Sequence, residues 1–183
     1  KYASYSKTGK NVKFDTLLYP TRAGEQADIT VSELAAEDLA HGAISIKGEG
    51  IDAVYYVKNN DSTDGRIGDS GTTDAKMVYM SKDYSSVIMV DGTYVSDSSG
   101  AKMIEGNTKI PSMSVKKNGS TLEIVGDKLL PAAETGAAIK IKMNGITSVM
   151  LNGEPVELKT DGEGNIVSVM AFTDNSFVVN GKT

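Results

Sequence analysis

The sequence contains no cysteine, no tryptophan and only one histidine, His41. Without cysteine there is no disulfide framework, no thiolate chemistry and no zinc site built on cysteine. A single histidine removes the commonest general base and metal ligand from any pair of side chains. No serine lies in a Gly-x-Ser-x-Gly elbow, so we expect no catalytic triad around His41.

A clear excess of charge of one sign is also missing. Lysine and arginine number 19 against 24 aspartates and glutamates, which gives a formal net charge of -5 with both signs mixed along the chain. Because no basic stripe offsets this charge, nucleic acid is not expected as a partner. The sequence also lacks an apolar leader and any apolar run of about 18 residues, which predicts no membrane span.

The sequence does contain short runs in which apolar and polar residues alternate, separated by turn residues that include many of its 19 glycines. A period of two is typical of half-buried strands. We expect residues 1–183 to form one all-β domain, an antiparallel β-sandwich of about a dozen short strands. The expected strands are 14–19, 28–34, 43–47, 51–57, 75–80, 86–90, 93–95, 113–116, 121–125, 138–143, 146–151, 155–159, 166–172 and 176–179.

Glycine-containing dipeptides indicate where consecutive strands form hairpins. Asp-Gly and Asn-Gly favour the turns whose twist matches that of two paired strands. The sequence therefore predicts turns at Asp91-Gly92, at Asn144-Gly145 and at Asn152-Gly153, and a further hairpin between 113–116 and 121–125. The only helical candidate is 32–40, where Ser32 could cap at most one short helical turn.

The segment 58–74 has almost no apolar side chains, so we expect a mobile loop with no face to bury. Its carboxylates Asp61, Asp64 and Asp69 could supply hard oxygen ligands to calcium. The register of an EF-hand fails here, because a glycine stands where a bidentate glutamate is required. A solvated acidic loop without metal is the alternative, and no other cofactor is expected.

Tyr55 and Tyr56 are the candidate carbohydrate-binding residues. They are neighbours in an expected strand, so one should face the core and the other should face outward. The outward ring could stack on a sugar, although ordinary half-buried strand tyrosines are the alternative. The eight methionines lie mostly at strand positions and are interpreted as adaptable core residues.

Two segments carry a resemblance to a known family. FDTLLYPTRAGEQADITVSEL at 14–34 and AKMVYMSKDYSSVIMVDGTYV at 75–95 resemble the C-terminal β-sandwich part of heparinase II/III-like polysaccharide lyases. In that family the catalytic histidine and tyrosine and the zinc ligands belong to the helical toroid and the central sandwich. None of those motifs is identifiable here, so the resemblance implies an accessory part and does not make this chain a lyase.

The expected function follows from the resemblance and from the missing catalytic residues. We expect a non-catalytic accessory module of a secreted or cell-surface bacterial polysaccharide-degrading protein, cut from a longer chain or freed of its leader. Its partners would be the neighbouring catalytic domain of the same chain and a polysaccharide. A free-standing carbohydrate- or cell-surface-binding domain is the alternative, and a small enzyme using carboxylates or tyrosine is a third.

Overall fold

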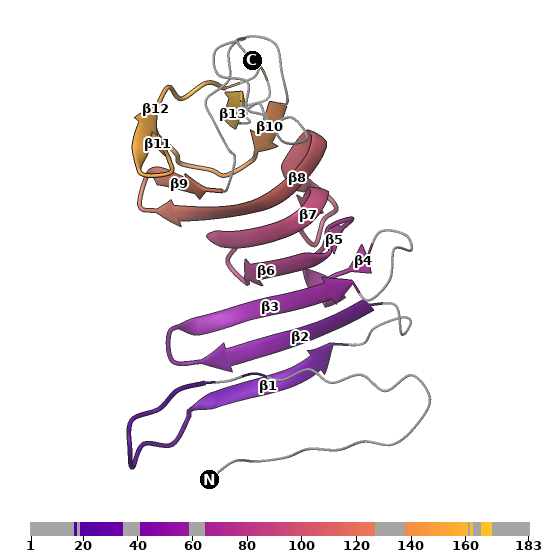
Figure 1. Ribbon diagram of the computed structural model, residues 1–183, viewed down its shortest axis with the longest axis vertical. Coiled ribbons are helices and arrows are strands. Elements are labelled where there is room, and N and C mark those ends of the chain that lie inside the picture. The colour runs from indigo at the N-terminus through magenta and orange to yellow at the C-terminus, as the bar shows by residue number, and fades with distance from the viewer. Residues whose placement is uncertain are drawn as a thin grey trace.

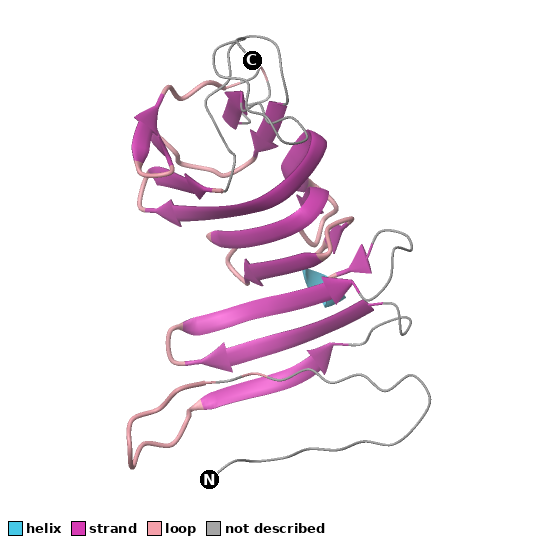
Figure 2. Cartoon of the chain, viewed as in Figure 1, coloured by secondary structure: helices cyan, strands magenta, loops and turns pink. Residues whose placement is uncertain are grey.

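The computed structural model describes residues 17, 19–34, 41–58, 65–126, 138–160, 162 and 166–169. Within them, thirteen strands belong to one hydrogen-bonded sheet, and the only helix is a short 3-10 turn, η1 (Gly68–Ser70), as Figure 2 shows. The prediction of an all-β, mostly antiparallel chain is confirmed. The strands are β1 (Ile29–Leu34), β2 (His41–Gly48), β3 (Ile51–Lys58), β4 (Gly65–Arg66), β5 (Thr72–Thr73), β6 (Met77–Ser81), β7 (Ser86–Ser96), β8 (Lys102–Asn118), β9 (Thr121–Val125), β10 (Ala138–Ile141), β11 (Ser148–Leu151), β12 (Glu154–Val156) and β13 (Ile166–Val169).

The sheet runs in the order β1-β2-β3-β6-β7-β8-β9-β11-β12, and β10 joins β8 to β13 as a side branch. Figure 1 shows the N-terminal strands as an open ladder, whereas the strands after β8 curl into a roll at the C-terminal end. The facing layers of the expected sandwich are therefore parts of a single sheet that turns over on itself.

The curl begins at an irregularity in β8, the longest strand. Gly92 of β7 pairs with Ile110 of β8, but Tyr94, two residues further on, pairs with Glu105. Extra residues on one strand bend it and increase its twist. The bulge at 106–109 thus separates two halves of β8, of which the first pairs with β10 and the second with β9.

One face of the sheet, which we call the inner face, carries the core. The register aligns its side chains in rows across the strands, as in Tyr56, Val78, Met89 and Met113. Alternation of this kind buries one face of β6, β7 and β9. β1 lacks it, and Ile46 and Ala53, which point to the other face, are buried as well. Met80, Met89, Met103 and Met113 are all buried, which confirms the core interpretation for these four methionines.

Residues 65–76, which we call the covering segment, cover one end of the inner face of β1 to β3, at Leu34 and Tyr56. Ile67 and Ala75 are fully buried within it. A Cβ at Gly65 would lie 1.6 Å from the Tyr56 hydroxyl, and one at Gly68 would lie 2.8 Å from the Leu34 side chain. The prediction of a mobile loop with nothing to bury is therefore wrong for residues 65–74. Residues 59–64 lie outside the described residues.

The turn predicted at Asp91-Gly92 is also wrong, because β7 runs through it without a break. Asp91 does have a positive φ of 55°, but the register of β7 with β8 is the same on both sides of it, since Val90 pairs with Ser112 and Gly92 with Ile110. A Cβ at Gly92 would lie 2.5 Å from the Cα and Cβ of Ala75. The glycine thus permits the covering segment to approach β7, and it does not reverse the chain.

Of the three remaining hairpin predictions, two are confirmed and one is wrong. The hairpin of β8 with β9 around Gly119 is confirmed, and so is the hairpin of β11 with β12 at Asn152-Gly153, whose residues both have positive φ. The hairpin across Asn144-Gly145 is wrong, since β11 pairs in parallel with β9 instead. This pairing brings Val149 and Leu151 onto the inner face.

Residues 32–34 belong to β1 and not to a helix, and 35–40 lie outside the described residues.

Candidate functional site

The two tyrosines predicted to bind carbohydrate lie on opposite faces of β3. Tyr56 is fully buried in the core, between Ala43 and Val78 in the register, so its ring cannot stack on a sugar. Tyr55 points to the other side of the sheet, which we call the outer face, and is half-buried. Of the predicted pair, only Tyr55 remains available to a partner.

Tyr55 belongs to an apolar row that crosses the outer face. It pairs with Ile44 on one side and with Tyr79 on the other, and Tyr79 pairs with Ile88. We call Ile44, Tyr55, Tyr79 and Ile88 the outer row. Sequence reasoning missed Tyr79, although its alternation with the buried Val78 and Met80 was the signal that could have found it.

Further apolar side chains extend the outer face beyond this row. Val125 continues it at the far end through Ser114, and Val31 lies beside Ile46 on the edge strand β1. Val125 is 56% exposed, Val31 45% and Ile88 36%. Three exposed apolar side chains on the same face as the outer row favour an interaction surface there.

The structure places only one of the three predicted calcium ligands. Asp69 lies in η1 with a fully exposed side chain, 3.6 Å from the Arg66 guanidinium. Asp61 and Asp64 lie outside the described residues. Across the residues that the structure does describe, no group of three or more acidic, histidine or cysteine side chains could hold a metal ion. Calcium binding by this loop stays a prediction.

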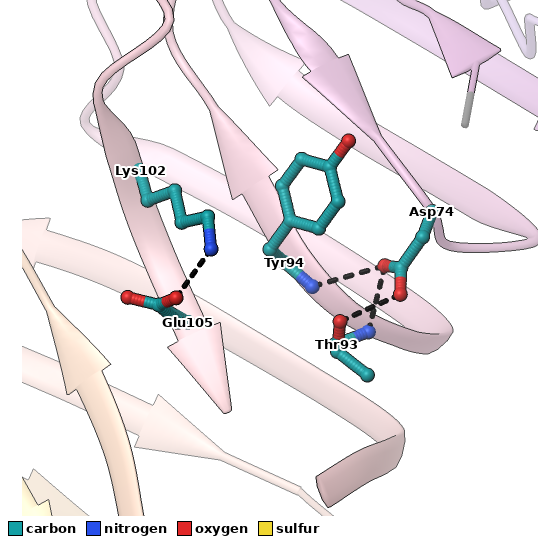
Figure 3. Close-up of polar contacts among 5 residues, drawn as sticks. All are labelled: Asp74, Thr93, Tyr94, Lys102 and Glu105. Carbon is teal, nitrogen blue, oxygen red and sulfur yellow. Dashed lines mark hydrogen bonds and ion pairs between the residues drawn. The ribbon is translucent and has the colours of Figure 1, made fainter. Parts of the chain in front are cut away.

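Asp74, the last residue of the predicted loop, has a structural role that Figure 3 shows. Its carboxylate accepts hydrogen bonds from the Thr93 amide at 2.7 Å, the Thr93 hydroxyl at 2.6 Å and the Tyr94 amide at 3.0 Å. On the other side of Tyr94, Lys102 forms an ion pair with Glu105 and lies 5.4 Å from the centre of the ring. Both oxygens of Asp74 thus tie the covering segment to β7.

A pocket of about 670 Å³ opens where turns from four parts of the chain converge. The contributing parts are the β6–β7 turn, the β7–β8 turn, the β8–β9 hairpin and the segment after β10. No local sequence motif predicts this site, because its residues come from distant turns that the curl of the sheet brings together. Its lining residues are Asp83, Tyr84, Ser85, Asp97, Ala101, Met103, Lys117, Gly119, Lys142, Met143 and Asn144.

Two carboxylates in the pocket are held in their ionised form. The pKa of Asp83 is lowered by the Ser81 hydroxyl and by hydrogen bonds from Ser85. The pKa of Asp97 is lowered chiefly by the Ser99 hydroxyl, with smaller effects of backbone amides and of the Lys142 charge. A glycosidase-type general acid needs a raised pKa, so this pair does not fit acid catalysis of that kind.

Tyr84 has a strained backbone at the rim of the pocket. Its φ is 60°, a region that bulky side chains rarely adopt. Its hydroxyl accepts a hydrogen bond from the Ser98 amide at 3.3 Å and donates one to the Ser70 carbonyl at 3.4 Å. Strained residues are concentrated at ligand-binding sites, where the surrounding structure holds them in place. Tyr84 thus connects the β6–β7 turn with the β7–β8 turn and with η1.

No protein-family profile matches the chain, and no curated protein matches it. In the part of the chain that the structure describes, no helix has the length and apolar character needed to cross a bilayer. The outer row and the pocket are therefore the structural features considered below.

Proposed function

We propose that this chain is a non-catalytic accessory module of a secreted or cell-surface bacterial polysaccharide-degrading protein. Its outer row packs on the catalytic domain of that protein and helps to shape that domain. The resemblance of residues 14–34 and 75–95 to the C-terminal part of heparinase II/III-like lyases supports the class of protein and the location. The exposed apolar side chains of the outer face support the packing role.

The observation that carries the proposal is the contrast between the two faces of the sheet. Residues 65–76 cover the inner face at Leu34 and Tyr56, and Ile67 and Ala75 of this segment are fully buried. The outer face bears half-exposed tyrosines and aliphatic side chains along a row of paired strands. Removing such side chains from water contributes about 25 cal/mol per Å² of apolar area toward association, before the cost of ordering the two surfaces is subtracted. A neighbouring domain would supply that burial.

The Tyr55–Tyr79 pair also supports the second candidate, a free-standing carbohydrate-binding domain. Two adjacent rings could offer a flat surface to a sugar chain. The residues that flank the pair in its row are Ile44 and Ile88, which supply no hydrogen bonds for sugar hydroxyls. Specific ligand recognition needs a few well-placed polar groups. The row therefore favours a protein surface over a glycan.

The absence of catalytic activity is tested directly on the isolated chain. With uronic-acid polysaccharides as substrates, we expect no absorbance from an unsaturated elimination product, while a lyase run in parallel produces it. Elimination needs a positioned base, and none of the catalytic motifs of the lyases that the sequence resembles is identifiable in this chain. Elimination that disappears in the His41→Ala variant would overturn the proposal and establish an enzyme.

A further inference from the structure

We propose that the pocket is a binding site for a neutral sugar. Its volume of about 670 Å³ lies within the range of about 300–1,000 Å³ that small-molecule sites occupy. Its walls combine hydrogen-bond donors and acceptors with an apolar surface. No function described above uses this site.

The acceptors in the pocket are held rigidly. Asp97 Oδ1 accepts hydrogen bonds from the Ser99 amide at 2.9 Å, the Ser99 hydroxyl at 2.6 Å and the Ala101 amide at 3.0 Å. Within the described residues every hydrogen bond of the Asp97 side chain ends on Oδ1, which leaves Oδ2 for a ligand. A carboxylate that is already fixed loses little freedom when a ligand binds.

The donors lie on other turns of the same pocket. Lys117 Nζ donates to the Asn144 carbonyl at 2.7 Å, and an ammonium group has two further protons to give. Lys142 lines the pocket as well, and its charge acts on Asp97. Carboxylates only accept and ammonium groups only donate, so both are satisfied by a ligand whose neighbouring hydroxyls do both.

The apolar wall and the charge balance narrow the ligand class. Tyr84, Met103 and Met143 line the pocket and suit the C–H face of a sugar ring. The two carboxylates of Asp83 and Asp97 line the same pocket as the two ammonium groups of Lys117 and Lys142, so the formal charges sum to zero. A charged ligand would be attracted by one pair and repelled by the other. A neutral sugar is attracted through hydrogen bonds to both.

This inference does not depend on the proposed packing role. Lys117 pairs with Leu122, which lies on the inner face, whereas Lys116 pairs with Glu123 on the outer face. Pocket and outer row thus lie on opposite sides of the sheet. A failure of sugar binding would leave the outer row untouched, and the elimination assay reports on neither site.

The test is saturation-transfer NMR with cellobiose, maltose and lactose, compared with glucuronate and glucosamine at the same concentration of about 10 mM. We expect at least one neutral disaccharide to bind with a Kd of about 1 mM and the charged sugars to bind more weakly. Asp97→Asn keeps the Oδ1 acceptor of the turn and removes the charge, and it should weaken binding about tenfold. Lys142→Gln should act in the same direction.

Lys116→Gln and Asp69→Asn are the matched controls, because they remove the same charges outside the pocket, and they should leave binding unchanged. Unfolding temperatures close to that of the parent chain show that each variant is folded. Absence of binding by all three neutral disaccharides overturns the inference. So does tighter binding of either charged sugar, and so does binding that Asp97→Asn and Lys142→Gln leave unaltered.

Discussion

Replacement of Gly71 by alanine is expected to lower the free energy of unfolding by about 4 kcal/mol, as two separate effects add. Gly71 has φ 149° and ψ -164°, a conformation that is essentially restricted to glycine. A Cβ there would also lie 1.9 Å from the backbone carbonyl oxygen of Ser96, which cannot move away without disrupting β7. Urea unfolding followed by circular dichroism measures the change.

Gly100→Ala is the control for this variant. Gly100 also has a positive φ, of 85°, but a Cβ there meets nothing within 4 Å. Its loss should be about 1–2 kcal/mol, the penalty of the backbone conformation alone. Equal losses in the two variants would show that the covering segment does not approach β7 as closely as the structure has it.

The second large effect is expected at Tyr56. Truncation to alanine should lower the free energy of unfolding by about 3–5 kcal/mol, as for other large side chains deleted from a core. Tyr56 is fully buried, and residues on three sides contact or approach it: Ala43, Val78 and Gly65. Thermal and urea unfolding of the isolated chain provide the measurement.

Tyr55→Ala is the matched variant, because the neighbouring tyrosine lies on the outer face of the same strand and is only half-buried. We expect a loss of about 1 kcal/mol or less, typical of a surface position. The reverse order, with Tyr55 the more destabilising site, would mean that the core lies on the opposite face of the sheet.

Local features of the sequence predicted much of the fold. The alternation of apolar and polar residues predicted many of the strands. It also correctly predicted that Tyr55 and Tyr56 point to opposite faces of the sheet. Asn152-Gly153 gave a true hairpin because both of its residues adopt the positive φ that such a turn needs. Each of these outcomes depends on residues within a few positions of one another.

The predictions that failed depend on contacts between distant segments. The few apolar residues of 65–76 are enough to cover part of the core. Gly65 lets this segment approach Tyr56 closely, and Gly92 of β7 leaves room for Ala75. Asp91-Gly92 has the composition of a turn, but Asp91 forms ion pairs with Lys76 and Lys109 inside a continuous strand. The parallel pairing of β9 with β11 has no local signature either.

The candidate sites were less predictable than the fold for the same reason. Tyr55 was identified, but its partner Tyr79 becomes visible only once the pairing of β3 with β6 is known. The pocket joins residues from 83 to 144 through the curl of the sheet. Its charged residues stand singly in the sequence, each within an ordinary turn.

The most direct test of the packing role is hydroxyl-radical footprinting of the tyrosines in the isolated chain and in the complete natural protein. In the isolated chain we expect oxidation of Tyr55 and Tyr79, none of the buried Tyr56, and oxidation of the half-buried Tyr94 near the β7–β8 turn. In the complete protein Tyr55 and Tyr79 should become protected while Tyr94 stays reactive. Equal oxidation of Tyr55 and Tyr79 in both forms, or a natural protein with no catalytic domain beside this one, would contradict the account.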